Sequence, residues 1–218
     1  MGEAFEDASS YFTALGEQNM LYLEENPMIS DDAAEASMDY DAVQALRSAV
    51  AIQNTIHPNQ KHHLFNDDLR FGNILVKEGT FDICAVLDWE FCYTAPASFL
   101  QSPPWWIIGK EPFEWDEEDK TKYSMWLKIF IELIREEEIH GNYADTLSAA
   151  MQKYWDDGTF WLTVGLREYR FLKEVLNHTK GVSCFTRLRE EDAAESLGKQ
   201  KMEQRRRCEA EVLERNPS

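Results

Sequence analysis

Cysteine is scarce in this chain, with four among 218 residues, and no two of the four form a C-x-x-C pair. No histidine stands at a metal-site interval from them, so the sequence predicts neither a zinc site nor a disulfide framework. Free thiols fit a reducing compartment, and we therefore expect a cytoplasmic protein. Cys84 lies within an apolar run, which predicts a small buried residue.

Long apolar runs and positive charge are also lacking. No stretch approaches the roughly 20 apolar residues of a membrane-spanning helix, and the first residues contain no apolar core of a signal peptide. The 22 Lys and Arg residues are outnumbered by 40 Asp and Glu residues, which gives a formal net charge of −18. A surface this acidic would repel nucleic acid and anionic membranes. Such an excess of acidic residues is typical of a solvated surface, and the surface would also tolerate a cationic small-molecule substrate.

Aromatic residues, in contrast, are plentiful: seven Trp, twelve Phe and eight Tyr favour a folded chain,. The length predicts one domain, which we assign to residues 1–188. Apolar residues recur at helical spacing in five stretches. These predict helices over residues 6–24, 41–56, 117–138, 145–155 and 160–178. An acidic, solvated connection is expected at residues 28–40, and irregular backbone at residues 93–115, where Pro103 and Pro104 stand beside Trp105 and Trp106.

The character of the sequence changes at residue 189. Residues 189–218 are highly charged, have few apolar positions and contain a basic run from Lys199 to Arg207. The apolar residues are too sparse for sustained heptads. We expect a solvent-exposed helix or a frayed tail, with a partner-binding helix as the functional alternative.

Three polar side chains stand inside an otherwise apolar part of the sequence. Asp68 and Asn73 precede the apolar run 74–76, and Asp88 follows the apolar run 83–87. Both runs predict short buried strands, joined as a β-hairpin or lying side by side across a glycine-containing turn. The three side chains would then meet at one point. Carboxylate and amide oxygens are ligands that suit Mg²⁺, which takes one or two carboxylates and leaves its other positions to water and phosphate.

These motifs resemble the catalytic and metal loops of the protein-kinase-like phosphotransferases. The run D-L-x-x-x-N from Asp68 to Asn73, followed by apolar-apolar-D-W-E around Asp88, is most similar to the aminoglycoside phosphotransferase and choline kinase family. That family usually has H-G before the first aspartate, where this chain has Asn66 and Asp67. One branch has D-D-L-R-P-x-N, which this sequence follows more closely. The resemblance extends to about residue 180.

The resemblance implies a mostly helical α+β fold, a protein-kinase-like C-terminal lobe whose short β-hairpin carries both loops. It implies that Asp68 is the catalytic base and that Arg70 faces the transferred phosphate. Asn73 and Asp88 would be the magnesium ligands and thereby hold the nucleotide. The implied cofactors are Mg²⁺ and ATP, and the implied reaction is transfer of the γ-phosphate to a hydroxyl of a small molecule. The family acts on varied acceptors, so the sequence does not name one.

Two hypotheses remain open on function. The sequence before Asp68 has no glycine-rich strand–turn–strand and no strand lysine, which the family's N-terminal lobe supplies. The chain would then be a fragment or truncated gene model of a kinase, or a lobe that persists as an inactive binding or structural module. We expect the chain alone to bind ATP and Mg²⁺ weakly. The plainest alternative is a polar loop in which Asp68, Asn73 and Asp88 only shape the backbone.

Overall fold

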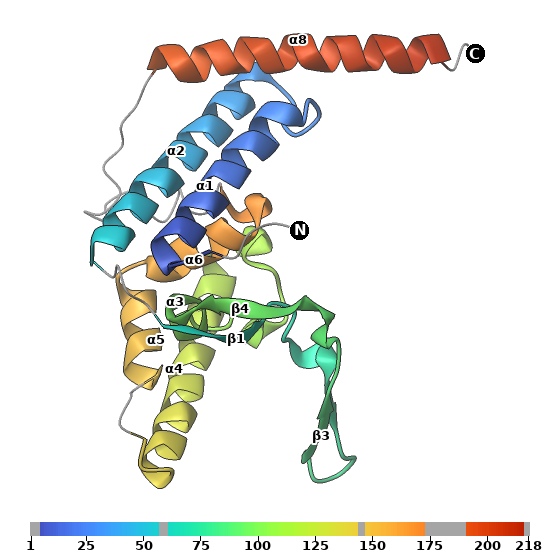
Figure 1. Cartoon of the computed structure of the whole chain (residues 1–218). Helices are drawn as coiled ribbons and strands as arrows, with labels where there is room; N and C mark the ends of the chain where they lie inside the picture. The colour runs from blue at the N-terminus through green and yellow to red at the C-terminus, as the bar shows by residue number, and fades with distance from the viewer. Residues whose placement is uncertain (1–4, 57–60, 144–146, 173–190, 216–218) are drawn as a thin grey trace. The chain divides into compact units, whose positions relative to one another are not determined.

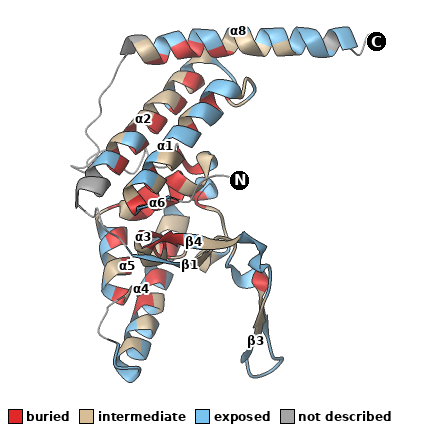
Figure 2. Ribbon diagram, viewed as in Figure 1, coloured by how far each residue is buried: buried red, intermediate tan, exposed pale blue. Residues whose placement is uncertain are grey.

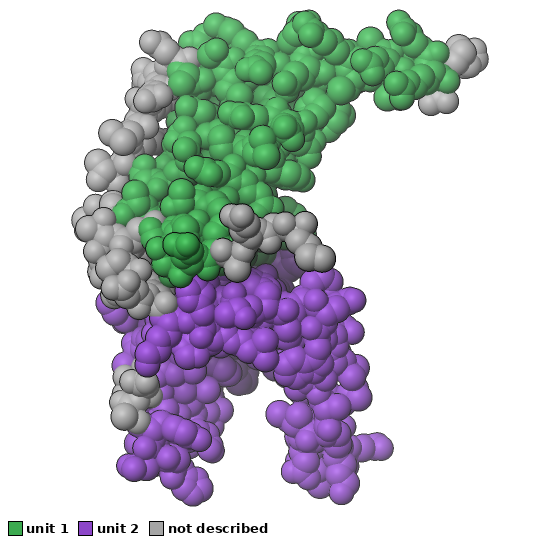
Figure 3. Space-filling model, viewed as in Figure 1, with its two compact units in different colours: residues 1–58, 164–218 green, residues 59–163 purple. Residues whose placement is uncertain are grey.

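The computed structural model describes most of the chain (Figure 1), namely residues 5–56, 61–143, 147–172 and 191–215. The chain divides into two compact units (Figure 3), residues 1–58 with 164–218 and residues 59–163. Most described residues are helical, and they include two antiparallel sheets of two strands each. The predicted mostly helical α+β class is therefore confirmed. None of the described helices is long and apolar enough to cross a membrane.

Two long helices, α1 (Ala8–Glu25) and α2 (Ala33–Ile56), pack against each other in the first unit. Asp7 begins α1 with a capping box, in which its carboxylate accepts a hydrogen bond from the Ser10 backbone nitrogen at 2.7 Å,. The helix predicted for residues 6–24 is confirmed. Its buried apolar stripe meets that of α2, and the two stripes include Ala8, Phe12, Leu23, Val43, Leu46 and Val50.

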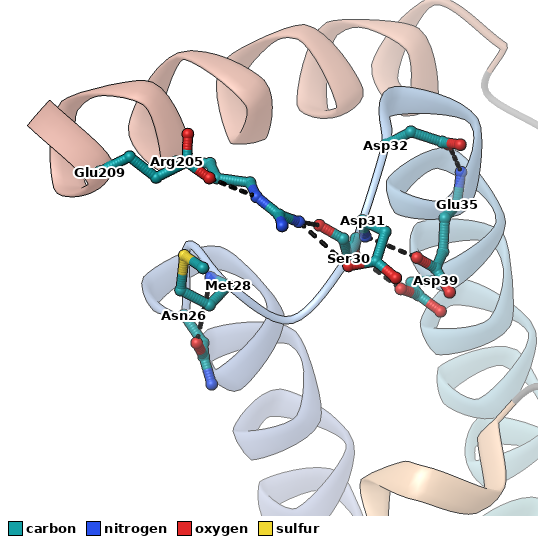
Figure 4. Close-up of polar contacts among 9 residues, drawn as sticks. All are labelled: Asn26, Met28, Ser30, Asp31, Asp32, Glu35, Asp39, Arg205 and Glu209. Atoms are coloured by element: carbon teal, nitrogen blue, oxygen red, sulfur yellow. Dashed lines mark hydrogen bonds and ion pairs between the residues drawn. The ribbon is translucent and has the colours of Figure 1, made fainter.

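Helix α2 begins eight residues earlier than predicted. The Asp32 carboxylate caps its first turn by accepting from the Glu35 backbone nitrogen at 2.8 Å,. Ala36 and Asp39 are buried, and Asp39 accepts a hydrogen bond from the Ser30 hydroxyl at 2.8 Å (Figure 4). The predicted solvated connection over residues 28–40 is therefore wrong from Ala33 onward. Its acidic residues serve as a cap and as a paired interior group, and so they are compatible with a helix.

The charged C-terminal stretch forms one helix, α8 (Glu191–Arg215), which packs on α2 (Figure 1). Ala194 and Leu197 are buried, and the Ser37 hydroxyl donates to the Ala194 carbonyl at 2.9 Å. Gly198 allows the close approach, because a Cβ at this position would lie 2.6 Å from the Ala33 carbonyl oxygen. The prediction of a helix is confirmed. The prediction of solvent exposure is wrong for the first part of α8, where Ala194 and Leu197 are buried.

Two cations of α8 hold the turn between α1 and α2. Lys201, only 1% exposed, donates to the carbonyls of Glu24 at 2.8 Å and Asn26 at 3.0 Å. Carbonyls at the end of a helix have no partner within it, so the ammonium supplies what the α1 terminus lacks. Arg205 donates to the Ser30 carbonyl at 3.0 Å and to the Asp31 carboxylate at 3.1 Å (Figure 4).

Helix α6 (Thr159–Arg167) is shorter than predicted. Glu168 has an extended backbone, and a single 3₁₀ turn, η5 (Tyr169–Phe171), follows. A continuous helix over residues 160–178 is therefore wrong as far as Leu172, and its remainder lies outside the described residues. The Glu168 side chain caps η5 by accepting from the Arg170 backbone nitrogen at 3.4 Å.

Two antiparallel strand pairs lie in the second unit. β1 (His62–Asn66) pairs with β4 (Cys92–Pro96), and β2 (Ile74–Val76) pairs with β3 (Ile83–Val86). The predicted hairpin is thus confirmed as β2–β3. The irregular backbone predicted from residue 93 is wrong for β4, which is followed by the short helix α3 (Ala97–Gln101).

The β2–β3 hairpin is exposed, contrary to prediction. Ile83 is 67% exposed, Leu75 and Val76 are each 48% exposed, and Cys84 is also exposed (Figure 2). Apolar runs predict burial only when another layer covers the strands, and a two-stranded sheet has two faces to cover. The predicted burial of both strands and of Cys84 is therefore wrong.

The core of the second unit is aromatic. Helices α4 (Glu117–His140) and α5 (Leu147–Asp156) contact each other, and Tyr123 of α4 is fully buried. The Tyr123 ring lies 4.5 Å from that of Trp115 and 5.7 Å from that of Phe160. The helices predicted for residues 117–138 and 145–155 are confirmed within the described residues. Trp126 of the same helix is 44% exposed.

Candidate functional site

The two strand pairs bring the two motif loops together. β1 ends where Asn66 pairs with Cys92, and the Asp67 backbone nitrogen donates to the Phe91 carbonyl at 3.3 Å. At the other end of the loop, the Leu87 backbone nitrogen donates to the Asn73 carbonyl at 2.8 Å. Residues 66–73 and 87–92 therefore lie side by side, as the hairpin prediction requires. Backbone hydrogen bonds between the loops fix the backbone on which the site side chains are mounted.

Asp68 is the centre of the first loop. Its backbone nitrogen donates to the Asn66 side-chain oxygen at 3.0 Å, which closes a tight turn,. The buried Asn73 side chain donates through Nδ2 to both the Asp68 carbonyl and Asp68 Oδ2, each at 2.8 Å. Since Nδ2 carries both amide hydrogens, these two bonds fix the orientation of the amide. Asn73 Oδ1 is thereby defined as the atom that could act as a metal ligand.

Arg70 donates to the other oxygen of the Asp68 carboxylate. Its Nε donates to Asp68 Oδ1 at 2.9 Å, so each oxygen of the Asp68 carboxylate accepts a charged or amide donor. The Arg70 side chain is 53% exposed, whereas that of Asp68 is 30% exposed. An exposed pair of this kind contributes little to stability, about 0–1 kcal/mol. Arg70 can therefore leave Asp68 for an anionic ligand at little energetic cost.

Asp88 follows β3 in an unusual backbone conformation. Its φ of 54° and ψ of 57° lie in the left-handed region, directly before the 3₁₀ turn η2 (Trp89–Phe91). A non-glycine residue there costs roughly 1–3 kcal/mol, and such residues cluster at functional sites. Asp88 is exposed, and the backbone nitrogen of its neighbour Leu87 donates a hydrogen bond to the Asn73 carbonyl. The backbone thus places Asp88 beside the loop that holds Asp68.

Asp67 has a different role from its neighbour Asp68. Its carboxylate accepts a hydrogen bond from the Tyr93 hydroxyl at 3.1 Å, which ties the loop to β4. Among the described residues, no group of three or more His, Cys, Asp or Glu side chains is placed to hold a metal ion. A closed protein cage for a metal is therefore not formed there. Asn73 with one or two carboxylates remains the donor set that suits Mg²⁺ completed by water and phosphate.

Three aromatic residues within these loops have exposed side chains, and the sequence analysis did not predict this exposure. Phe71 is 59% exposed, Trp89 55% and Phe91 53%. The Phe71 ring stands edge-to-face on Trp106 at 4.8 Å, and Trp106 also contacts Phe130 at 6.4 Å. Trp106 therefore contacts both Phe71 of the first loop and Phe130 of α4. The signal that could have revealed the exposed surface is the presence of aromatic residues within the motif loops themselves.

No protein-family model, curated protein or solved structure matches this chain. The resemblance to phosphotransferases therefore depends on the loop motifs, and the geometry of these loops is the structural observation that bears on function.

Proposed function

We propose that the loops 66–73 and 87–92 form a magnesium- and phosphate-binding site of the kinase-like phosphotransferase type. One observation carries the proposal. The Asn73 amide donates two hydrogen bonds to Asp68, and Asp88 directly follows Leu87, whose backbone nitrogen donates to the Asn73 carbonyl. Taken alone, each residue has a structural explanation. Together they place Asp68, Asn73 and Asp88 on adjoining loops, which supports the proposed site.

In the proposed reaction, Asp68 orients a hydroxyl of the acceptor and takes its proton as that oxygen bonds to the γ-phosphorus of ATP, while the bond from this phosphorus to the bridging oxygen breaks and ADP leaves. Arg70, released from Asp68, donates to the oxygens of the transferred phosphate. Asn73 Oδ1 and the Asp88 carboxylate would hold Mg²⁺, which when bound offsets the negative charge of the ATP phosphates. The acceptor class is a small molecule with a hydroxyl group, and the charge of −18 is compatible with a cationic one,.

The second candidate is a catalytically inactive kinase-like module for binding or structure. The observation that favours it is the closed hydrogen-bond set of Asp68, whose two carboxylate oxygens accept from Arg70 and Asn73. In such a module the same contacts would serve to shape the loop. The two candidates differ in whether metal and nucleotide engage the carboxylates.

A melting titration with Mg²⁺, with and without ATP, tests the proposal. We expect weak stabilisation by Mg²⁺, which ATP increases only slightly and Asp88→Asn largely removes. Asp82→Asn is the matched control: Asp82 lies in the same hairpin, is exposed, and accepts a hydrogen bond from the Thr80 hydroxyl at 2.7 Å. The control should retain the metal response. Equal responses in the two variants, or none in the wild type, would overturn the proposed site.

Phosphate transfer distinguishes the two candidates. We expect this chain to hydrolyse ATP near the background rate. The sequence before Asp68 has no glycine-rich phosphate loop and no strand lysine, and one missing electrostatic contact can lower a rate by roughly 100-fold. Robust turnover that Asp68→Asn abolishes would establish the enzyme. Metal binding without turnover would favour the binding module.

A further inference from the structure

Helix α4 carries apolar residues on two faces, and the core of the second unit covers only one of them. The covered face includes Tyr123, Leu127 and Ile131, all of which are buried. A second set of apolar side chains, which we call the α4 stripe, is 44–56% exposed: Met125, Trp126, Ile129 and Leu133. An apolar stripe on a helix normally faces a partner. The described elements of the chain leave this one open.

The four residues of the α4 stripe form one continuous surface. Successive residues of an α-helix are about 100° apart around its axis. Met125 and Leu133 therefore lie within about 40° of Ile129, and Trp126 lies within about 60° of it. The buried residues of α4 lie about 120–160° away, on the opposite side of the helix. Single exposed apolar residues are common on protein surfaces, whereas a contiguous apolar patch marks an interaction site.

A charged residue continues the α4 stripe at each end. Lys122 comes seven residues before Ile129 and Glu136 seven residues after it, which places both within about 20° of the same line,. Both side chains are exposed. Lys120, in contrast, pairs with Glu117 of the same helix at 2.7 Å. Among the residues that the structure describes, neither Lys122 nor Glu136 has an ion pair or a side-chain hydrogen bond.

The order of these residues is self-complementary. In an antiparallel pair of α4 helices with a two-fold axis at Ile129, residues equally far before and after Ile129 would lie level with each other. Lys122 would then face Glu136 of the second copy, and Met125 would face Leu133 of the second copy. The symmetry would form each contact twice, and Ile129 would meet itself. Opposite charges beside an apolar seam set the orientation of paired helices.

The net charge bears on what could cover the α4 stripe. A surface with a formal charge of −18 would repel an anionic membrane,. A second copy of the chain has the same charge, but physiological salt screens exposed charges that are more than about 8 Å apart. The apolar contacts and the ion pairs of the seam act at shorter range and would persist.

We propose that two copies of this chain associate through the α4 stripe, antiparallel, with Lys122 of each copy paired with Glu136 of the other. The proposal does not depend on the proposed phosphate site, because it uses only the exposed face of α4.

Sedimentation velocity of the full chain over a series of concentrations tests the association. We expect the mass of the wild type to rise from 25.4 kDa toward twice that value as the concentration increases. Ile129→Lys would place two like charges at the centre of the seam and should abolish the dimer. Ile83→Lys is the matched control, since Ile83 is also exposed but lies in β3, and this variant should associate as the wild type does.

Two charge reversals test the orientation of the helices. Lys122→Glu and Glu136→Lys would each replace two attractions by two repulsions, and each should weaken the dimer by roughly fivefold to thirtyfold. Mixing the two variants restores opposite charges at both ends of the seam and should restore the affinity. In a parallel pair each residue would face its own copy, so a single reversal would cause no loss.

Glu137→Lys is the control for net charge. It changes the charge of the chain as Glu136→Lys does, but residue 137 lies about 100° further around the helix. Because both variants reduce the negative charge, a general effect of repulsion would strengthen the dimer in both. The proposal is overturned if the wild type stays monomeric up to its solubility limit, or if Ile129→Lys associates as the wild type does. It is equally overturned if Glu136→Lys and Glu137→Lys have the same effect.

Discussion

Replacing Lys201 by methionine tests how α8 stabilises the first unit. Methionine keeps a long apolar stem but removes the ammonium that binds the Glu24 and Asn26 carbonyls,. A hydrogen bond from a charged donor contributes roughly 1.5–3 kcal/mol. Burial of the charge offsets part of this, and the same burial lowers the pKa of Lys201. We expect Lys201→Met to reduce the free energy of unfolding by about 2–4 kcal/mol, because two carbonyls at the end of α1 lose their charged donor,.

The matched control is Lys199→Met on the same helix. Lys199 is largely exposed and pairs with Glu195 one turn away, a contact that contributes about 0.3–0.5 kcal/mol,. Urea unfolding followed by far-UV circular dichroism measures both variants, since this signal reports on the helices of both units. All seven Trp residues lie between residues 89 and 161, so their fluorescence reports on the second unit. If the two variants lost equal amounts of unfolding free energy, the stabilising role that we assign to the Lys201 hydrogen bonds would be refuted.

Two further changes test packing and ionisation. Gly198→Ala should destabilise by about 1–3 kcal/mol, despite a helix-propensity gain of about 1 kcal/mol, because the new Cβ would meet the Ala33 carbonyl at 2.6 Å,. Its control is Gly16→Ala, where the nearest atom is Arg47 Cγ at 3.3 Å; urea midpoints that fall equally would contradict the packing argument. Burial raises the pKa of Tyr123 well above 10, so above pH 10 the unfolded chain loses a proton that the folded chain keeps,. Stability should therefore fall as pH rises above 10, and Tyr123→Phe should make this decline shallower; an unchanged slope in pH-dependent urea unfolding would exclude Tyr123 as a cause.

The helices were predictable from sequence wherever one face carries their apolar residues. Tyr123, Leu127 and Ile131 recur every four residues, and all three are buried on α4. The start of α2 was missed because acidic residues suggested a solvated segment, whereas Asp39 is buried with Ser30 as its partner. The docking of α8 was missed for a related reason. It depends on a glycine contact and on cations bonded to backbone carbonyls, and neither leaves an apolar periodicity.

For the candidate site, the motif spacing predicted which residues share a loop, but it did not predict their conformations. The contact between Asp68 and Asn73 follows from a separation of five residues across one tight turn. The left-handed backbone of Asp88 was not predicted, because a positive φ is uncommon for residues other than glycine,.

The exposure of the loops determines how strongly the proposed phosphate site can act. Arg70 and Asp88 are exposed, so water screens their charges, and attraction at a given distance is several-fold weaker than in a dry site,. The aromatic side chains Phe71, Trp89 and Phe91 are exposed on the same loops. A surface that covered these rings would also exclude water from the carboxylates and strengthen their hold on a cation. Metal affinity and the exposure of the rings would therefore be linked, and the weak Mg²⁺ binding that we propose follows from loops that are open to water.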